Sequence, residues 1–148
     1  MKQLRNIRTL TAWIGLLGLV LTLSLRANDS KDAKAEKPAP KGYYDVESPQ
    51  AASILKRFPK LIILDIRTPR EYAAGHLKGA KNIDFFEDNF AAEIGKLDPK
   101  KGYLVHCASG GRSGKSMKTF KEKGFTTVYH IADGYKGWVA AKLPTVKE

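Results

Sequence analysis

From position 42 onward, short and almost continuously apolar runs alternate with stretches in which apolar residues recur at helical spacing. A strand of a parallel sheet is covered on both faces, so a nearly continuous apolar run is typical of it. The alternation of such runs with helical stretches therefore predicts an α/β fold with a parallel sheet flanked by helices. Strands are predicted at 61–66, 80–83, 103–107 and 126–131.

Helix start and stop signals stand between these runs. Ser48 is followed by proline, which is typical of an N-cap and the first helical residue. Thr68 and Glu71 have the spacing of a capping box, again with a proline between them. Gly124 follows a later helical stretch, where a glycine commonly ends a helix. The predicted helices run over 49–57, 69–75, 88–96, 113–123 and 134–141.

The N-terminal part has a different pattern. Residues 10–25 form an uncharged apolar run behind a basic start, which is the layout of a signal peptide. The apolar run is slightly long for a cleaved signal peptide and short for a membrane-spanning helix. Residues 1–27 are therefore predicted to be either a signal peptide or a membrane anchor. In the second case, residues 10–25 would tether the protein to the membrane. Both alternatives predict an extracytoplasmic protein, periplasmic or secreted.

A polar segment follows the apolar run. Residues 28–42 are rich in charged residues, alanine and proline and contain little to bury, so they are predicted to be a flexible tether. The globular domain is predicted to occupy 43–148. This length is enough for one packed core and leaves no room for a second domain.

Composition and charge limit the partners. The net charge is +11, but four of the basic residues lie in 1–27, and without them 22 basic residues face 15 acidic ones. A balance of +7 suits a small anionic substrate, an acidic partner or a membrane surface. Nucleic acid is not predicted, because the lysines are scattered and no recognition helix is apparent. The single cysteine excludes an internal disulfide, and no metal site is predicted because the cysteine and three histidines lack zinc-ligand spacing.

The cysteine stands at a position where α/β proteins bind ligands. Cys107 ends a predicted strand, and a loop rich in small residues leads from it into the next helix. Backbone N–H groups of such a loop, together with the N-terminus of the helix, form an anion cradle that also favours thiolate over thiol. We therefore predict a nucleophilic cysteine. The residues predicted to bind substrate around it are Ala108, Ser109, Gly110, Gly111 and Arg112.

Spacing distinguishes three chemistries for this loop. Segment 109–116 has Ser109 where a Walker A motif has its first glycine, so a nucleotide-binding loop is disfavoured. Cysteine phosphatases have five residues between cysteine and arginine, whereas four separate Cys107 from Arg112. The smaller ring fits the terminal sulfur of a persulfide better than a phosphoryl group.

The chain resembles the rhodanese-like sulfurtransferases over 43–144. The resemblance rests on Leu64-Asp65-Ile66-Arg67 with Glu71 and Tyr72; Gly75-His76-Leu77-Lys78-Gly79-Ala80 with Asn82; Cys107-x-x-Gly110-x-Arg112-Ser113; and Gly124-Phe125 with Gly134 to Trp138. It implies a five-stranded parallel sheet in the order 1-5-4-2-3. It also implies that Cys107 takes sulfane sulfur from an anionic donor such as thiosulfate and passes it to a thiol or cyanide-like acceptor, without a cofactor.

The resemblance also implies roles for residues outside the loop. Arg67 matches a position that faces the anionic donor in some members, so it is a candidate for substrate binding. Arg112 could contact an anion or lock the loop by pairing with Glu71, and we favour the locking role. Asp133 replaces a family glycine and could alter substrate preference. The remaining candidates are expected to support the site structurally: Asp65, Glu71, His76 and Ser113.

Two functions remain open at the sequence level. One is a sulfurtransferase that turns over. The other is a sulfur-carrier or binding module that holds a persulfide on Cys107 for a dedicated protein partner. The sequence does not distinguish them, and it leaves the oligomeric state open.

Overall fold

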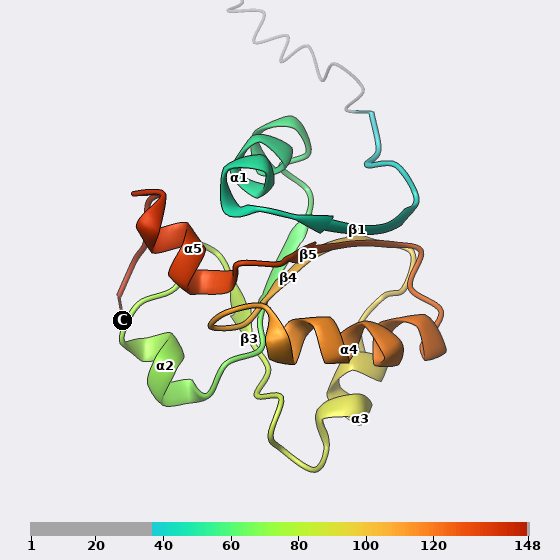
Figure 1. Cartoon of the computed structure of the whole chain (residues 1–148). Helices are drawn as coiled ribbons and strands as arrows, with labels where there is room; N and C mark the ends of the chain where they lie inside the picture. The colour runs from blue at the N-terminus through green and yellow to red at the C-terminus, as the bar shows by residue number, and fades with distance from the viewer. Residues whose placement is uncertain (1–36, 148) are drawn as a thin grey trace, which may run out of the picture. The chain divides into compact units, whose positions relative to one another are not determined.

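The computed structural model describes residues 37–147, in which five strands form one parallel sheet in the order β1-β5-β4-β2-β3 (Figure 1). This confirms the predicted fold class and strand order. The strands are β1 (Gly42–Val46), β2 (Ile62–Asp65), β3 (Lys81–Asn82), β4 (Gly102–His106) and β5 (Thr127–Ile131). The helices are α1 (Ser48–Arg57), α2 (Pro69–Ala73), α3 (Phe90–Gly95), α4 (Gly111–Glu122) and α5 (Gly134–Ala140).

The predictions for the N-terminal part fall mainly outside the described residues. The signal peptide or membrane anchor at 1–27 lies wholly outside them, as does the predicted tether as far as residue 36. Within 37–147, no helix is long and apolar enough to cross a membrane. β1 begins at Gly42, the last residue of the predicted tether.

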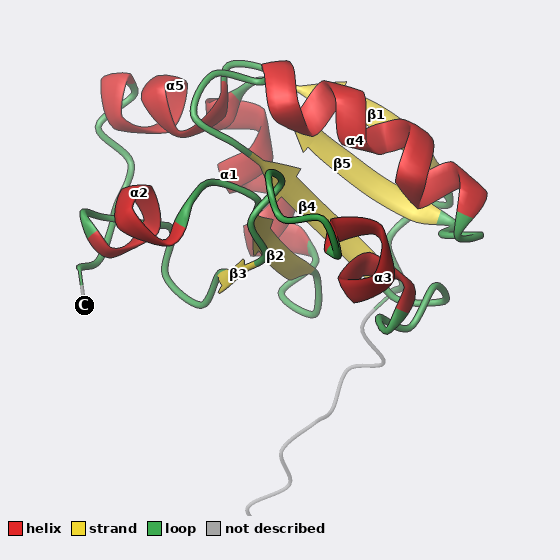
Figure 2. Ribbon diagram, turned by 90° about the horizontal axis from the view of Figure 1, so that it is seen from below, coloured by secondary structure: helices red, strands yellow, loops and turns green. Residues whose placement is uncertain are grey.

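Helices cover both faces of the sheet, and each face has its own core. Figures 1 and 2 show α1 and α5 on one side of the sheet and α3 and α4 on the other. Because strand residues alternate between faces, Leu104 packs with Ala51 of α1 and Trp138 of α5. Its neighbour Val105 packs on the opposite face with Phe120 of α4. Helices packed on both faces explain why the central strands are apolar at nearly every position.

The four strands marked by the apolar pattern are present, and the structure adds a fifth. β1 is an edge strand with the sequence Gly-Tyr-Tyr-Asp-Val, and only its last residue is buried. The apolar pattern therefore did not mark it, whereas the family resemblance implied it.

The predicted start of α1 is wrong by one residue. Ser48 is the first residue of the helix, and Glu47 is its N-cap, with the Glu47 backbone N–H donating to Gln50 Oε1 at 3.0 Å. The Ser48 hydroxyl donates instead to Asp133 Oδ1 at 2.7 Å. The local cap is therefore the capping box of Glu47 and Gln50, and a carboxylate from a distant segment adds to it.

The start of α4 also differs from the prediction. The helix begins at Gly111, two residues before the predicted start, because Gly110 adopts a left-handed conformation with φ of 83° and turns the chain directly into the helix. A β-carbon at Gly110 would collide with the carbonyl group of Ala132. Arg112 and Ser113 therefore lie in the first turn of α4, which brings their N–H groups beside Cys107.

Candidate active site

Cys107 lies immediately after β4, at the carboxyl edge of the sheet and on the side covered by α3 and α4. Its exposed fraction is only 1%. The backbone N–H groups of Ser109, Arg112 and Ser113 are directed at its sulfur. The Ser113 hydroxyl adds a contact of 3.4 Å to the Cys107 Sγ atom. The first turn of α4 and the preceding loop thus form the predicted cradle around the sulfur.

These hydrogen bonds change the acidity of the thiol. Burial raises the pKa of the Cys107 thiol, but the hydrogen bonds from the Ser113 hydroxyl and from the three N–H groups together lower it below its ordinary value. Each of these donors stabilises negative charge on sulfur more than it stabilises the neutral thiol. The site therefore favours the nucleophilic form of the cysteine.

Helix α5 holds the cysteine loop from the other side. The N–H of Tyr135 donates to the Cys107 carbonyl at 2.8 Å, and the N–H of Lys136 donates to the Ala108 carbonyl at 2.9 Å. Gly134 has a φ of 61°, and a β-carbon there would overlap the backbone of Ala108 and Ser109. The first turn of α5 is thus anchored directly to the start of the loop.

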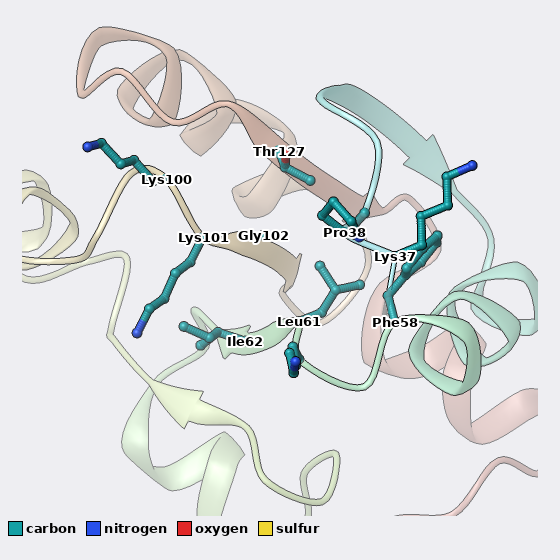
Figure 3. Close-up of a pocket in the computed structure, with 11 residues that line it drawn as sticks. Lys37, Pro38, Phe58, Leu61, Ile62, Lys100, Lys101, Gly102 and Thr127 are labelled. Carbon is teal, nitrogen blue, oxygen red and sulfur yellow. The ribbon is translucent and has the colours of Figure 1, made fainter. Parts of the chain in front are cut away.

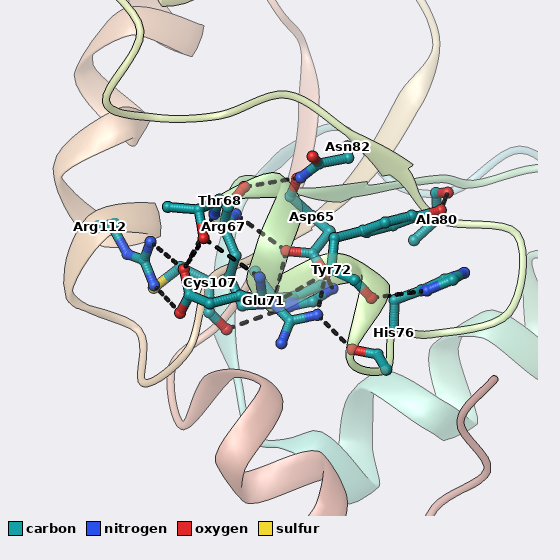
Figure 4. Close-up of polar contacts among 12 residues, drawn as sticks. Asp65, Arg67, Thr68, Glu71, Tyr72, His76, Ala80, Asn82, Cys107 and Arg112 are labelled. Carbon is teal, nitrogen blue, oxygen red and sulfur yellow. Dashed lines mark hydrogen bonds and ion pairs between the residues drawn. The ribbon is translucent and has the colours of Figure 1, made fainter. Parts of the chain in front are cut away.

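Arg112 pairs with Glu71, as the sequence suggested. Its Nη1 and Nη2 atoms donate to the two carboxylate oxygens of Glu71 at 2.9 and 2.7 Å (Figure 4). The Arg112 hydrogen bonds, together with those from Thr68, lower the pKa of Glu71 to about 2, and Glu71 in turn raises the pKa of Arg112. The pair ties the first turn of α4 to the N-terminus of α2.

The structure places Arg67 in a buried ion pair. Its Nε donates to both oxygens of Asp65 at 2.9 and 3.0 Å, and its Nη2 donates to Asp65 and to the Gly75 carbonyl (Figure 4). The guanidinium also stacks on the ring of Tyr135 at 3.9 Å. Arg67 is only 3% exposed, and its guanidinium is engaged by Asp65, Gly75 and Tyr135. This arrangement favours a structural role, and donor binding by Arg67 stays a prediction.

The three histidines of the described residues have different surroundings. His76 stacks on Tyr72, and its Nδ1 contacts the Tyr72 carbonyl at 3.1 Å, which agrees with the structural role expected for it. His106 is fully buried on the opposite face of β4 from Val105, with its ring near Tyr135 of α5. Burial lowers the pKa of His106.

His130 contacts the cysteine site and was not predicted. Its Nε2 lies 2.9 Å from Ser113 Oγ, and its Nδ1 lies 2.8 Å from Asp45 Oδ1. Asp45 and His130 are paired positions on the adjacent strands β1 and β5. The sequence signal for this contact is that both are polar residues within strands. The apolar pattern did not mark β1, however, and the contact follows only once β1 and β5 are known to be neighbours.

Asp133 contacts Ser48 at the start of α1. Its Oδ1 accepts hydrogen bonds from the backbone N–H and the hydroxyl of Ser48 at 3.1 and 2.7 Å. The carboxylate therefore binds the N-terminus of α1, where the helix dipole favours negative charge. This geometry gives Asp133 a structural role, and an effect on substrate preference stays a prediction.

A cavity lies at the other edge of the sheet. It has a volume of about 570 Å³ and opens between the starts of β2, β4 and β5, where Ile62, Gly102 and Thr127 line it (Figure 3). This is the amino edge of the sheet, opposite the edge that carries Cys107. Within 37–147, no cluster of three His, Cys, Asp or Glu side chains could hold a metal ion.

Comparison with known proteins identifies the family. A family model described as a rhodanese-like domain matches residues 48–141. This chain belongs to the rhodanese-like domain family, which confirms the resemblance seen in its sequence.

Two curated relatives and two solved structures illustrate the match. Thiosulfate sulfurtransferase 16, chloroplastic, of Arabidopsis thaliana is 35% identical over 95 residues, covering 55% of this chain and 77% of that protein. Thiosulfate sulfurtransferase GlpE of Pseudomonas entomophila is 35% identical over 91 residues, covering 62% and 81%. The polysulfide-sulfur transferase homodimer of Wolinella succinogenes has a TM-score of 0.59 and 27% identity over 72% of this chain and 80% of that one. A rhodanese-related protein from Thermoplasma volcanium shares the fold, with a TM-score of 0.63 and 24% identity over 72% and 100%.

Proposed function

We propose that this protein is a sulfurtransferase that carries sulfur as a persulfide on Cys107. The observation that supports it most is the convergence of three backbone N–H groups and the Ser113 hydroxyl on the Cys107 sulfur. The thiolate attacks the sulfane sulfur of thiosulfate, the S–S bond of the donor breaks, and sulfite leaves with the electron pair. The acceptor, a thiolate or cyanide, then removes the outer sulfur and regenerates the Cys107 thiolate.

The loop offers donors for the added sulfur. The backbone N–H groups of Gly110 and Gly111 have no protein partner among residues 37–147. An outer persulfide sulfur is negatively charged, so free N–H groups in the same loop would stabilise it as they stabilise other anions. The proposed chemistry uses only groups of this chain and the two substrates.

The choice of thiosulfate as donor rests on the relatives. The Arabidopsis and Pseudomonas proteins are named thiosulfate sulfurtransferases, whereas the Wolinella protein is named a polysulfide-sulfur transferase. We propose thiosulfate as the first donor to test and polysulfide as the second. We also propose that the protein acts outside the cytoplasm, on the basis of the apolar run at 10–25.

A sulfur carrier that serves a protein partner is the second candidate. Both arginines near the site are engaged by carboxylates, and Cys107 is 1% exposed, so a small anion meets no unpaired arginine there. Phe86 lies 5.3 Å from the Arg112 guanidinium and is 66% exposed. An exposed aromatic side chain next to Arg112, in the first turn of α4, is a residue type that partner surfaces use as an anchor.

Mass spectrometry and a cyanide assay test the proposal. After incubation with thiosulfate, the wild-type protein should gain one sulfur atom on Cys107, and Cys107→Ser should gain none because a hydroxyl cannot form a persulfide. Thiocyanate formation should fall by at least about a thousandfold in the variant, as expected when a nucleophile is removed. Persulfidation without turnover would support the carrier, and an unmodified wild-type protein with both donors would contradict both candidates.

A further inference from the structure

A continuous chain of side-chain hydrogen bonds reaches Cys107 from the solvent-facing side of β1. It runs from Asp45 Oδ1 to His130 Nδ1 at 2.8 Å, from His130 Nε2 to Ser113 Oγ at 2.9 Å, and from Ser113 Oγ to Cys107 Sγ at 3.4 Å. We propose that Asp45, His130 and Ser113 form a proton relay in which His130 is the base that deprotonates Cys107. The inference deepens the proposed sulfur transfer, because it assigns how the nucleophile of that reaction is generated.

The hydrogen-bonding capacity of each group determines the direction of the relay. An ionised carboxylate only accepts, so Asp45 requires a proton on His130 Nδ1. Nε2 is then an unprotonated acceptor when the ring is neutral and a donor when the ring is charged. Ser113 Oγ both donates and accepts, so it can receive a proton from one neighbour while giving one to the other. The remaining polar atom near Nε2 is the Gly110 carbonyl oxygen at 3.1 Å, which accepts from the charged ring.

The proton transfer balances without any added reactant. The S–H bond of Cys107 breaks, and its proton passes to Ser113 Oγ as the Ser113 proton passes to His130 Nε2. Sulfur keeps the electron pair, and nothing is oxidised or reduced. The products are a thiolate that accepts a hydrogen bond from Ser113 and an imidazolium that donates one to Asp45. The Asp45 carboxylate stabilises the imidazolium, and the hydrogen-bond donors around Cys107 stabilise the thiolate.

The sheet register explains why these residues meet. Asp45 and His130 are directly paired positions of β1 and β5, and His130 is paired with Val105 of β4. Val105 and Cys107 lie two residues apart and share the face of the sheet that α4 covers. His130 therefore lies on the same face as the cysteine, and Ser113 in the first turn of α4 bridges the space between them.

The side chains that face His130 come from β1 and α4. Asp45 lies on β1, and Ser113 on α4, whereas Tyr43, Tyr44 and Lys121 line a cavity of about 330 Å³ beside the ring. The Lys121 Nζ atom lies 5.1 Å from the Tyr43 ring. The Asp45 carboxylate contacts the imidazole directly, although its side chain is 80% exposed and solvent screens its charge. Asp45 is thus a positioning residue, and His130 is the base.

The rate of alkylation of Cys107 by iodoacetamide tests the relay without any sulfur substrate. The pH profile should be measured for the wild type and for Asp45→Asn, His130→Gln and Ser113→Ala. Near neutral pH, His130→Gln should react about a hundredfold more slowly, at the lower end of the range that a general base contributes, and Asp45→Asn should show a smaller loss. Above the ordinary pKa of a cysteine, about 8.5, hydroxide replaces the base and the His130→Gln and Asp45→Asn rates should approach the wild-type rate.

A control variant and a double variant separate the relay from structural damage. Asp88→Asn removes an exposed carboxylate that takes no part in the hydrogen bonds of the relay. It should leave the profile of Cys107 unchanged. The double variant Asp45→Asn/His130→Gln should react no more slowly than His130→Gln alone, because Asp45 acts only through the imidazole.

The outcomes distinguish the relay from the proposed sulfur transfer. Equal rates in the wild type, Asp45→Asn and His130→Gln would overturn the relay, as would a loss of the same size at every pH. Asp45→Asn changes an exposed side chain, so this result can be obtained even if His130→Gln does not fold. A protein with the expected alkylation profile and no persulfide after donor treatment would keep the relay and refute the sulfur transfer.

Discussion

At the scale of single residues, the ion pair of Glu71 and Arg112 connects the cysteine loop to the rest of the site. Glu71 accepts four hydrogen bonds when its contacts with Thr68 and Arg112 are taken together. A carboxylate with this many donors is stabilised in its charged form, which is why the pKa of Glu71 falls from 4.5 to about 2. The pair therefore contributes to the stability of the fold as well as to the position of Arg112.

The lowered pKa of Glu71 predicts how stability depends on pH. A carboxyl group whose pKa is depressed by folding contributes fully above its unfolded pKa, and the contribution is lost as the pH falls from 4.5 towards 2. Because the Glu71 side chain is 35% exposed, solvent screening reduces the expected contribution to about 1 kcal/mol. Denaturant unfolding of Glu71→Gln should show this loss near neutral pH, and the difference from wild type should shrink on acidification. A difference independent of pH would contradict this interpretation.

At the scale of elements, Asp133 links the start of α5 to the start of α1. Its carboxylate binds the N–H and the hydroxyl of Ser48, and Gly137 leaves room for it, since a β-carbon at Gly137 would overlap the Asp133 side chain. The first turn of α5 also holds the carbonyls of Cys107 and Ala108. One helix N-terminus thus connects α1 with the cysteine loop.

Replacement of Asp133 separates this structural role from a role in substrate preference. Asp133→Ala should lower the free energy of unfolding by about 1 kcal/mol, the usual effect of losing a helix-capping side chain. Asp133→Asn retains an acceptor oxygen and should lose less. The KM for thiosulfate should stay unchanged in both variants, measured with the cyanide assay. A changed KM without a change in stability would support a role of Asp133 in substrate preference.

At the scale of the whole molecule, we propose that the apolar run at 10–25 directs export of the domain. Leu17→Arg places a charge in the middle of this run, at a cost of about 3 kcal/mol for insertion into a membrane. Cell fractionation with protease protection should find the wild-type domain outside the cytoplasm and this variant retained inside. Lys34→Arg, which keeps the charge in the polar segment, serves as the control. A wild-type protein found only in the cytoplasm would refute export.

The sequence alone determined the fold class and the chemical centre. Apolar runs at β2, β4 and β5 have to be buried on both faces, so their pattern was strong enough to identify the parallel sheet. The cysteine loop was equally clear, because a thiol between a strand and a helix with small residues between them has few structural alternatives. The ordered motifs, including that loop, also indicated the family.

The tertiary structure decided which polar residues meet. Arg67 and Asp133 carry charges that looked available to a substrate, but the fold engages one with Asp65 and the other with the N-terminus of α1. Asp45 and His130 lie 85 positions apart, and they meet because β1 and β5 are neighbours in the sheet. Local patterns record burial and helix signals, whereas contacts between distant polar side chains depend on strand order and register, which only the packed sheet determines.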